Sequence, residues 1–218
     1  MRLLLYGLQA SGASATAMLA AQRPGCLALV DVPSYACTPA FGQDRDAMAK
    51  AVVSLTHPFA DHVAAFRPHA VVLVTRDPLR HYASAAAKAY RDRDGTLEEK
   101  IAAFDALYAA RARHADAVVR HEDLMARDPA VLATFARLGW ELPDDAFDLP
   151  RGIDAILDAL LTHERTLFDT FDHGFGEARP DGGIGRGGVR ERPPLPPTER
   201  ARVLELAPHL ARAYGHKA

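Results

Sequence analysis

The sequence predicts a three-layer α/β domain with a central parallel sheet. Short apolar runs of strand length alternate along the chain with helical segments. These runs are continuously apolar, as expected for parallel strands that helices cover on both faces. The first run also ends in a Gly-containing turn that opens an Ala-rich helix, which is a P-loop-like strand–loop–helix arrangement.

The individual elements follow from periodicity and from the residues that begin or end them. Strands are predicted at 3–6, 26–32, 70–75 and 118–119. Helices are predicted at 14–21, 57–66, 79–91, 97–117, 129–138, 153–171 and 198–214, with Asp128 and Thr198 as N-caps. The segment 33–43 is predicted to be irregular. The segment 179–197, rich in Gly, Pro and Arg, is predicted to be a mobile loop that becomes ordered over a bound nucleotide.

Length and charge exclude several classes of protein. A chain of 218 residues, 49% hydrophobic, is predicted to form one domain over 1–218 that closes with a C-terminal helix within 198–218. A net charge of -2 gives no general attraction to nucleic acid or to anionic membranes.

The initial apolar run is too short for a signal peptide and is interpreted as the first strand, so a cytoplasmic protein is expected. Cys26 and Cys37 form neither a disulfide framework nor a metal-ligand spacing, and no metal is expected.

The first turn has the spacing of a phosphate-binding loop. Residues 7–14 (GLQASGAS) match G-x-x-x-x-G-K-[ST] except that Ala13 stands at the lysine position. Successive backbone N–H groups and the N-terminus of the following helix can still bind an anion there. An ordinary tight turn between a strand and a helix is the alternative interpretation.

A second anion-binding element is predicted after the clearest strand. Arg76 directly follows 70–75, and Ser84 lies eight residues further on, about two turns into the next helix. Ligands bind at the carboxyl ends of strands in open α/β sheets, and the planar guanidinium of an arginine suits a phosphate. A salt bridge from Arg76 to Asp77 or to another carboxylate is the alternative.

Taken in order, these motifs resemble the sulfotransferases that use 3′-phosphoadenosine 5′-phosphosulfate (PAPS). The resemblance covers nearly the whole chain and extends to the ending 208–215, which is similar to the terminal helix of bacterial members. It implies that the 5′-phosphosulfate is cradled by Gln9, Ala10, Ser11, Gly12, Ala13 and Ser14. It implies that the 3′-phosphate is bound by Arg76 and Ser84 and covered by Arg186, Gly187 and Gly188. Further similarities are the stretch 121–124 (HEDL), expected at a strand end, and Leu138-Gly139.

The resemblance implies transfer of a sulfuryl group from PAPS, as co-substrate, to a hydroxyl or amine of a small molecule or glycan. His57, in Thr56-His57-Pro58, resembles the family's general base, and an imidazole of pKa near 6.5 can accept the proton of the attacking group. Glu122 is the alternative base, or a residue that stabilises a strand end through hydrogen bonds. Tyr35 and Phe41 are candidates to line the acceptor pocket.

Two positions depart from the family pattern. Ala10 stands where the family usually carries Lys or Arg, and Ala13 removes a hydroxyl that contacts the 5′-phosphate. A replacement cation is sought among Lys50, Arg186, Arg190 and Arg192. Because of these departures, a catalytically weakened or non-catalytic nucleotide-binding protein of the same fold remains an alternative. A P-loop kinase or triphosphatase is a further alternative, disfavoured by Ala13.

Overall fold

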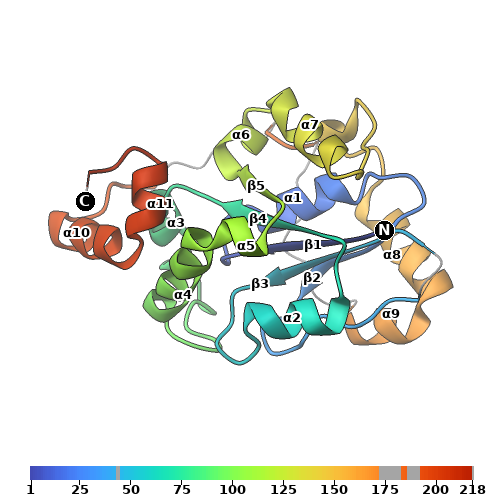
Figure 1. The fold of residues 1–218 in the computed structure, drawn as a ribbon, viewed down its shortest axis with the longest axis horizontal. Coiled ribbons are helices and arrows are strands. Elements are labelled where there is room, and N and C mark those ends of the chain that lie inside the picture. Colours follow the sequence, from blue (N-terminus) through green and yellow to red (C-terminus); the bar gives the residue numbers. More distant parts are fainter. Residues whose placement is uncertain (43–44, 172–182, 186–191, 218) are drawn as a thin grey trace.

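A five-stranded parallel sheet forms the centre of the computed structural model, which describes residues 1–42, 45–171, 183–185 and 192–217. Helices flank this sheet, and the strands lie in the order β2-β3-β1-β4-β5 (Figure 1). The strand bounds are Arg2–Gly7 for β1, Leu27–Val32 for β2, Ala47–Val52 for β3, Ala70–Thr75 for β4 and Ala117–Arg120 for β5. The predicted α/β class with a central parallel sheet is confirmed.

Strand β3 is the element that the sequence analysis missed. Its sequence, AMAKAV, contains three alanines and a lysine, so it has neither β-branched enrichment nor a continuous apolar run. The strand is nevertheless buried throughout, because it is inserted between β1 and β2 and hydrogen-bonds to both. Its register pairs Leu5 of β1 with Lys50. This pairing brings a lysine to the middle of the sheet.

Two hydrophobic clusters, one on each face of the sheet, form the core. Leu3 and Leu5 of β1 belong to one cluster, and Leu4 and Tyr6 belong to the other, as the alternation of side chains along a strand requires. The first cluster is covered by α1 (Ala13–Ala20), α6 (His121–Met125) and α7 (Pro129–Arg137). The second is covered by α2 (Phe59–Phe66) and α4 (Leu97–Ala109). Helices α8 (Ile153–His163) and α9 (Arg165–Phe171) pack beside the edge strand β2.

Several predicted helices are shorter or divided. Helix α3 spans only Pro78–Ala85, and the predicted helix 97–117 consists of α4, the short α5 (Arg111–His114) and the start of β5. The predicted helix 153–171 is divided at Glu164 into α8 and α9. Residues 121–124 directly follow the end of β5 at Arg120, as predicted, and they lie in helix α6. A 3-10 turn, Ala146–Asp148, precedes α8.

Proline positions decide the C-terminal helices. The helix predicted over 198–214 is two helices, α10 (Pro197–Leu206) and α11 (Pro208–Ala213), and Thr198 is not an N-cap. Each begins with a proline, whose missing N–H would be unsatisfied at a helix start anyway. In contrast, the predicted cap of α7 is confirmed, because the Asp128 carboxylate accepts a hydrogen bond from the Ala130 amide at 2.8 Å. Helix α10 packs against α3 and α4, and α11 packs against α4 (Figure 1).

Most of the predicted loop 179–197 lies outside the described residues, so its ordering on nucleotide binding stays a prediction. No helix in the described part of the chain is long and apolar enough to cross a membrane. Both cysteines are free thiols.

Candidate functional site

The two predicted anion-binding elements meet at one point of the sheet. Strands β1 and β4 are neighbours, but the chain leaves β1 toward β2 on one side and leaves β4 toward β5 on the other. Connections that diverge in this way open a crevice at the carboxyl ends of the two strands, where α/β proteins bind their ligands. Residues 8–12, named loop 8–12 below, follow β1, and Arg76 follows β4.

Loop 8–12 has the backbone shape of a tight cradle. Ala10 and Gly12 have positive φ values of 64° and 89°, and the Ser11 amide donates back to the Leu8 carbonyl at 3.1 Å. Helix α1 begins directly after Gly12, and no side chain caps its first N–H groups. These amides and the positive end of the helix are therefore available to an anion.

Three buried or half-buried side chains hold loop 8–12 in place. The Arg76 guanidinium donates to the Ala10 carbonyl at 2.9 Å. His81 Nε2 lies 2.7 Å from the Gln9 carbonyl, and it must carry the hydrogen because that carbonyl can only accept. Lys100 Nζ lies 3.5 Å from the Gln9 side-chain oxygen. Burial lowers the pKa of His81 to about 4, so its ring is neutral at pH 7.

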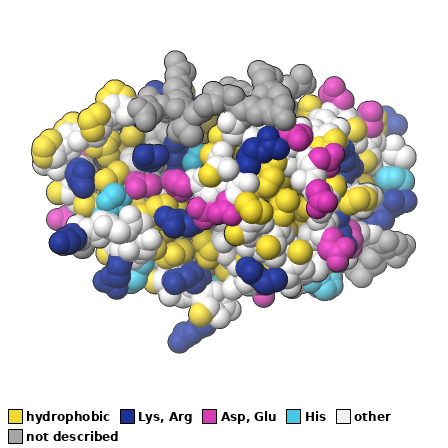
Figure 2. Space-filling model, turned by 90° about the horizontal axis from the view of Figure 1, so that it is seen from above, with side chains coloured by type: hydrophobic (Ala, Val, Ile, Leu, Met, Phe, Trp, Pro, Cys, Tyr) yellow, Lys and Arg dark blue, Asp and Glu magenta, His cyan; other side chains and the backbone are white. Residues whose placement is uncertain are grey.

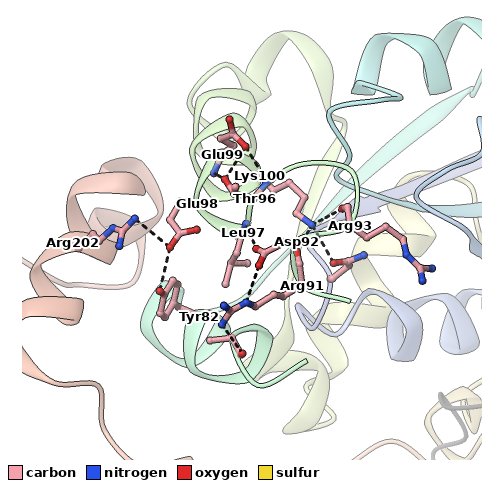
Figure 3. Close-up of polar contacts among 12 residues, drawn as sticks. Tyr82, Arg91, Asp92, Arg93, Thr96, Leu97, Glu98, Glu99, Lys100 and Arg202 are labelled. Carbon is pink, nitrogen blue, oxygen red and sulfur yellow. Dashed lines mark hydrogen bonds and ion pairs between the residues drawn. The ribbon is translucent and has the colours of Figure 1, made fainter. Parts of the chain in front are cut away.

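Lys100 also shapes the wall beside this loop (Figure 3). It is 2% exposed and donates to the carbonyls of Arg91 and Arg93, which belong to the irregular segment between α3 and α4. The same segment is held from the other side, where the Asp94 carbonyl accepts from the Leu55 amide at 3.0 Å. The Arg93 side chain points away from Lys100 and lines the cavity described next.

A cavity of about 640 Å³ opens at this end of the sheet, a volume in the range of small-molecule sites. The predicted donor-binding residues that line it are Gln9, Ala10, Gly12, Ala13, Ser14, Arg76 and Ser84. Residues far apart in the sequence are therefore brought to one cavity. Tyr35, a candidate for the acceptor pocket, lines it as well.

Other predicted residues lie elsewhere. Ser11 is buried and does not line the cavity. His57 does not line it either, and its Nε2 lies 3.2 Å from the Tyr35 carbonyl. Phe41 is buried in the core, so it is not a cavity wall. Arg192 is exposed and does not line the cavity. The residues predicted to cover the 3′-phosphate (Arg186, Gly187 and Gly188) and Arg190 lie outside the described residues.

The sequence analysis missed several cavity residues, namely Asp31, Lys88, Tyr90, Arg93 and His121. A signal existed for Asp31, because it interrupts an otherwise apolar run near the end of a predicted strand. None existed for Lys88 and Arg93, which come from a segment interpreted as helix and ordinary surface. Lys50, named only as one possible replacement cation, also lines the cavity, and its ammonium is ion-paired with the Asp31 carboxylate.

A smaller cavity of about 290 Å³ shares Arg76 and His121 with the first and is also lined by Glu122. Three buried polar atoms that have no hydrogen-bond partner among the described residues gather here, namely Arg76 Nε, His121 Nδ1 and Glu122 Oε2. The other Glu122 oxygen accepts from the Asp77 amide at 3.1 Å and so stabilises the turn that follows β4. Burial and the nearby Arg76 lower the pKa of His121 to about 4, so this imidazole is neutral at pH 7. Unsatisfied buried polar atoms are costly, and a polar ligand would satisfy them.

The charges lining the larger cavity favour an anion. Of the residues that the structure describes, four cationic side chains line it, Lys50, Arg76, Lys88 and Arg93, against one carboxylate, Asp31. On the face of the molecule drawn in Figure 2, basic and acidic side chains are instead interspersed. The lining of the cavity is thus positive although the chain as a whole has a net charge of -2. Among the described residues no group of three or more His, Cys, Asp or Glu side chains could hold a metal ion.

Replacing Gly12 by alanine is expected to damage the site. A Cβ at this position would lie 2.2 Å from His121 Nδ1, and the backbone has a φ of 89°. We expect Gly12→Ala to reduce the free energy of unfolding by about 1–3 kcal/mol and to weaken anion binding, because loop 8–12 must move. Urea unfolding measures the first effect. Gly152→Ala is the matched control, since nothing lies within 4 Å of a Cβ there, and equal losses in both variants would contradict the argument.

Comparison with known proteins adds no relative: no protein-family model and no curated protein matches the chain.

Proposed function

We propose that the chain transfers a sulfuryl group from PAPS to a hydroxyl or amine of a small molecule or glycan. The observation that carries this proposal is Arg76. It stands at the point where the strand connections diverge, donates to loop 8–12 at 2.9 Å, and retains a buried Nε without a partner. An arginine so placed suits a phosphate between two anion-binding elements.

Loop 8–12 and the start of α1 would bind the 5′-phosphosulfate, as a P-loop-like cradle. Arg76 and Ser84, which line the same cavity, would bind the 3′-phosphate. The resemblance of the sequence motifs to PAPS-dependent sulfotransferases supports this division of the donor. The smaller cavity beside Arg76, with its unsatisfied polar atoms, offers room for a further part of the nucleotide.

The proton of the attacking group has three candidate acceptors. The resemblance favours His57, whose ring contacts the Tyr35 carbonyl. Glu122, the alternative predicted from the sequence, lines the smaller cavity, and Asp31 lines the larger one. The base would take the proton as the acceptor attacks sulfur in line with the departing phosphate oxygen. Loss of a general base costs on the order of 10²–10⁴ in rate, so comparing His57→Gln, Glu122→Gln and Asp31→Asn separates the candidates.

A second candidate function is nucleotide binding without transfer. Ala10 and Ala13 favour it, because they remove a cation and a hydroxyl from the cradle. A P-loop kinase or triphosphatase is less well supported, because Ala13 leaves its loop without the lysine that binds the β- and γ-phosphates.

Calorimetric titration with 3′-phosphoadenosine 5′-phosphate (PAP), the desulfated product, tests the nucleotide site. We expect a Kd on the order of 1 μM for the wild-type chain. Arg76→Ala is expected to weaken binding at least about 30-fold, because losing a buried charged partner of a phosphate costs about 2 kcal/mol or more. Arg113→Ala, an exposed arginine of α5 away from the cavity, is the control and should bind as the wild type does. A folded wild-type protein that does not bind PAP would refute the proposed function.

A further inference from the structure

We propose that Lys50 is the cation that loop 8–12 lacks, and that it stabilises the phosphate oxygen released when the sulfuryl group leaves. This inference rests on the proposed function. The sequence pattern alone leaves four candidates for the replacement cation. Two of them, Lys50 and Arg192, belong to the described residues, and of these two only Lys50 lines the cavity.

Strand β3 brings Lys50 to the cradle. The register of β1 and β3 places Lys50 beside Leu5, two residues before β1 ends at Gly7. Helix α1 packs against both strands, and the first two residues of α1 line the cavity together with Lys50. The side chain of Lys50 therefore borders the same cavity as the residues that would hold the phosphosulfate.

The burial of Lys50 is unusual for a lysine with a single partner. Lys50 is 3% exposed, and in the described part of the chain its ammonium has one partner, the Asp31 carboxylate. An ammonium has three donors, so two remain for a ligand. Lys100, which is also buried, differs because the carbonyls of Arg91 and Arg93 and the Gln9 side chain occupy its donors.

The other cations of the cavity are less suitable. Arg76 already donates to the Ala10 carbonyl and is assigned to the 3′-phosphate. Lys88 and Arg93 belong to the segment that follows α3, and α3 comes directly after β4. Strand β4 lies on one side of β1, and the strand that carries Lys50 lies on the other. Arg192 does not line the cavity. Lys50 is thus the cation that lies on a strand directly adjacent to the cradle.

The proposed step is balanced without any further reactant. The acceptor oxygen forms a bond to sulfur while the bond from sulfur to the bridging oxygen breaks, and the bonding electrons pass to that oxygen on the 5′-phosphate. Lys50 donates a hydrogen bond to this oxygen and keeps its proton. As Lys50 turns toward the ligand it leaves Asp31, whose carboxylate can then accept the proton of the acceptor. Stabilising charge that develops only in the transition state accelerates the step.

The test follows the release of inorganic sulfate from radiolabelled PAPS, with water as the acceptor, in the full-length chain. Lys50→Met is expected to slow release by about 10²–10³-fold, as loss of one such donor does, and to weaken PAP binding as well, because PAP carries the released oxygen on its 5′-phosphate. Adding Ala10→Lys to Lys50→Met is expected to raise the rate at least about tenfold above that of Lys50→Met alone, because it returns a cation to the cradle. Lys217→Met, an exposed lysine, is the control and should leave the rate unchanged.

The outcomes separate the inference from the function on which it rests. Absence of PAP binding in the wild type would overturn the proposed function, and binding without sulfate release would overturn the inference and favour the non-catalytic alternative. A rate of sulfate release in Lys50→Met that is within about threefold of the wild-type rate would overturn the inference alone. If Lys50→Met does not fold, the rate of sulfate release is measured for Ala10→Lys in the otherwise wild-type chain. A rate within about threefold of the wild-type rate supports a cation already in place. A rate more than about tenfold above the wild-type rate contradicts it.

Discussion

Lowering the pH from 7 to 5 is expected to destabilise this protein by several kcal/mol. Three histidines, His62, His81 and His121, have pKa values lowered to about 4, in each case chiefly by burial. The structure accommodates these imidazole rings in their neutral form. His62 Nδ1 accepts from the Thr38 amide at 3.1 Å, and His81 donates to the Gln9 carbonyl. Protonation would place an unpaired charge beside these groups.

The direction of this pH effect on the free energy of unfolding follows from comparing the folded and unfolded states. The unfolded histidines have a pKa of 6.5 and the folded ones a pKa of about 4, so the unfolded chain binds more protons between these values. Stability is therefore fully present above pH 6.5 and is lost as the pH falls toward 4. Each histidine contributes at most about 1.4 kcal/mol per pH unit, and the three together about 6 kcal/mol at pH 5 as an upper bound.

Urea unfolding at pH 7, 6 and 5 measures this effect. His81→Gln should reduce the pH dependence by about one proton, because it removes one of the three titrating groups. His163→Gln is the control, since His163 is exposed at the end of α8. A free energy of unfolding that is equal at pH 7 and pH 5 would contradict the prediction.

Lys100→Met is expected to reduce the free energy of unfolding by about 2–4 kcal/mol and to weaken PAP binding. The substitution removes the charged donor shared by the carbonyls of Arg91 and Arg93, and each hydrogen bond to a charged group contributes about 1.5–3 kcal/mol. It also removes the contact to the Gln9 side chain, which helps to position loop 8–12. The effect is thus expected on both the stability and the site.

Urea unfolding and PAP titration measure the two parts. Lys217→Met serves as the control here as well, because it removes the same charge from an exposed position. Unchanged PAP affinity in a destabilised Lys100→Met protein would show that the cavity wall does not position loop 8–12. Unchanged stability would show that the Arg91 and Arg93 carbonyls find other donors.

The elements that the sequence determined by itself are those with local causes. The apolar run 70–75 coincides with β4, and Asp128 caps α7, because strand and cap preferences depend on a few neighbouring residues. The turn after β1 and the position of Arg76 after β4 are likewise local, and the structure brings both to one cavity. The predicted histidine base had no such local support beyond a resemblance, and His57 does not line the cavity.

Pairing between segments far apart in the sequence determined the remaining features of the fold and of the cavity. Only the sheet reveals that the alanine-rich segment 47–52 is a strand, because its burial comes from β1 and β2 on either side. The same pairing carries Lys50 to the cradle and places Asp31 against it. Likewise, burial of Lys100 and of the neutral histidines depends on which helices cover each face of the sheet. These environments are set by strand order and packing, which residues close in sequence cannot specify.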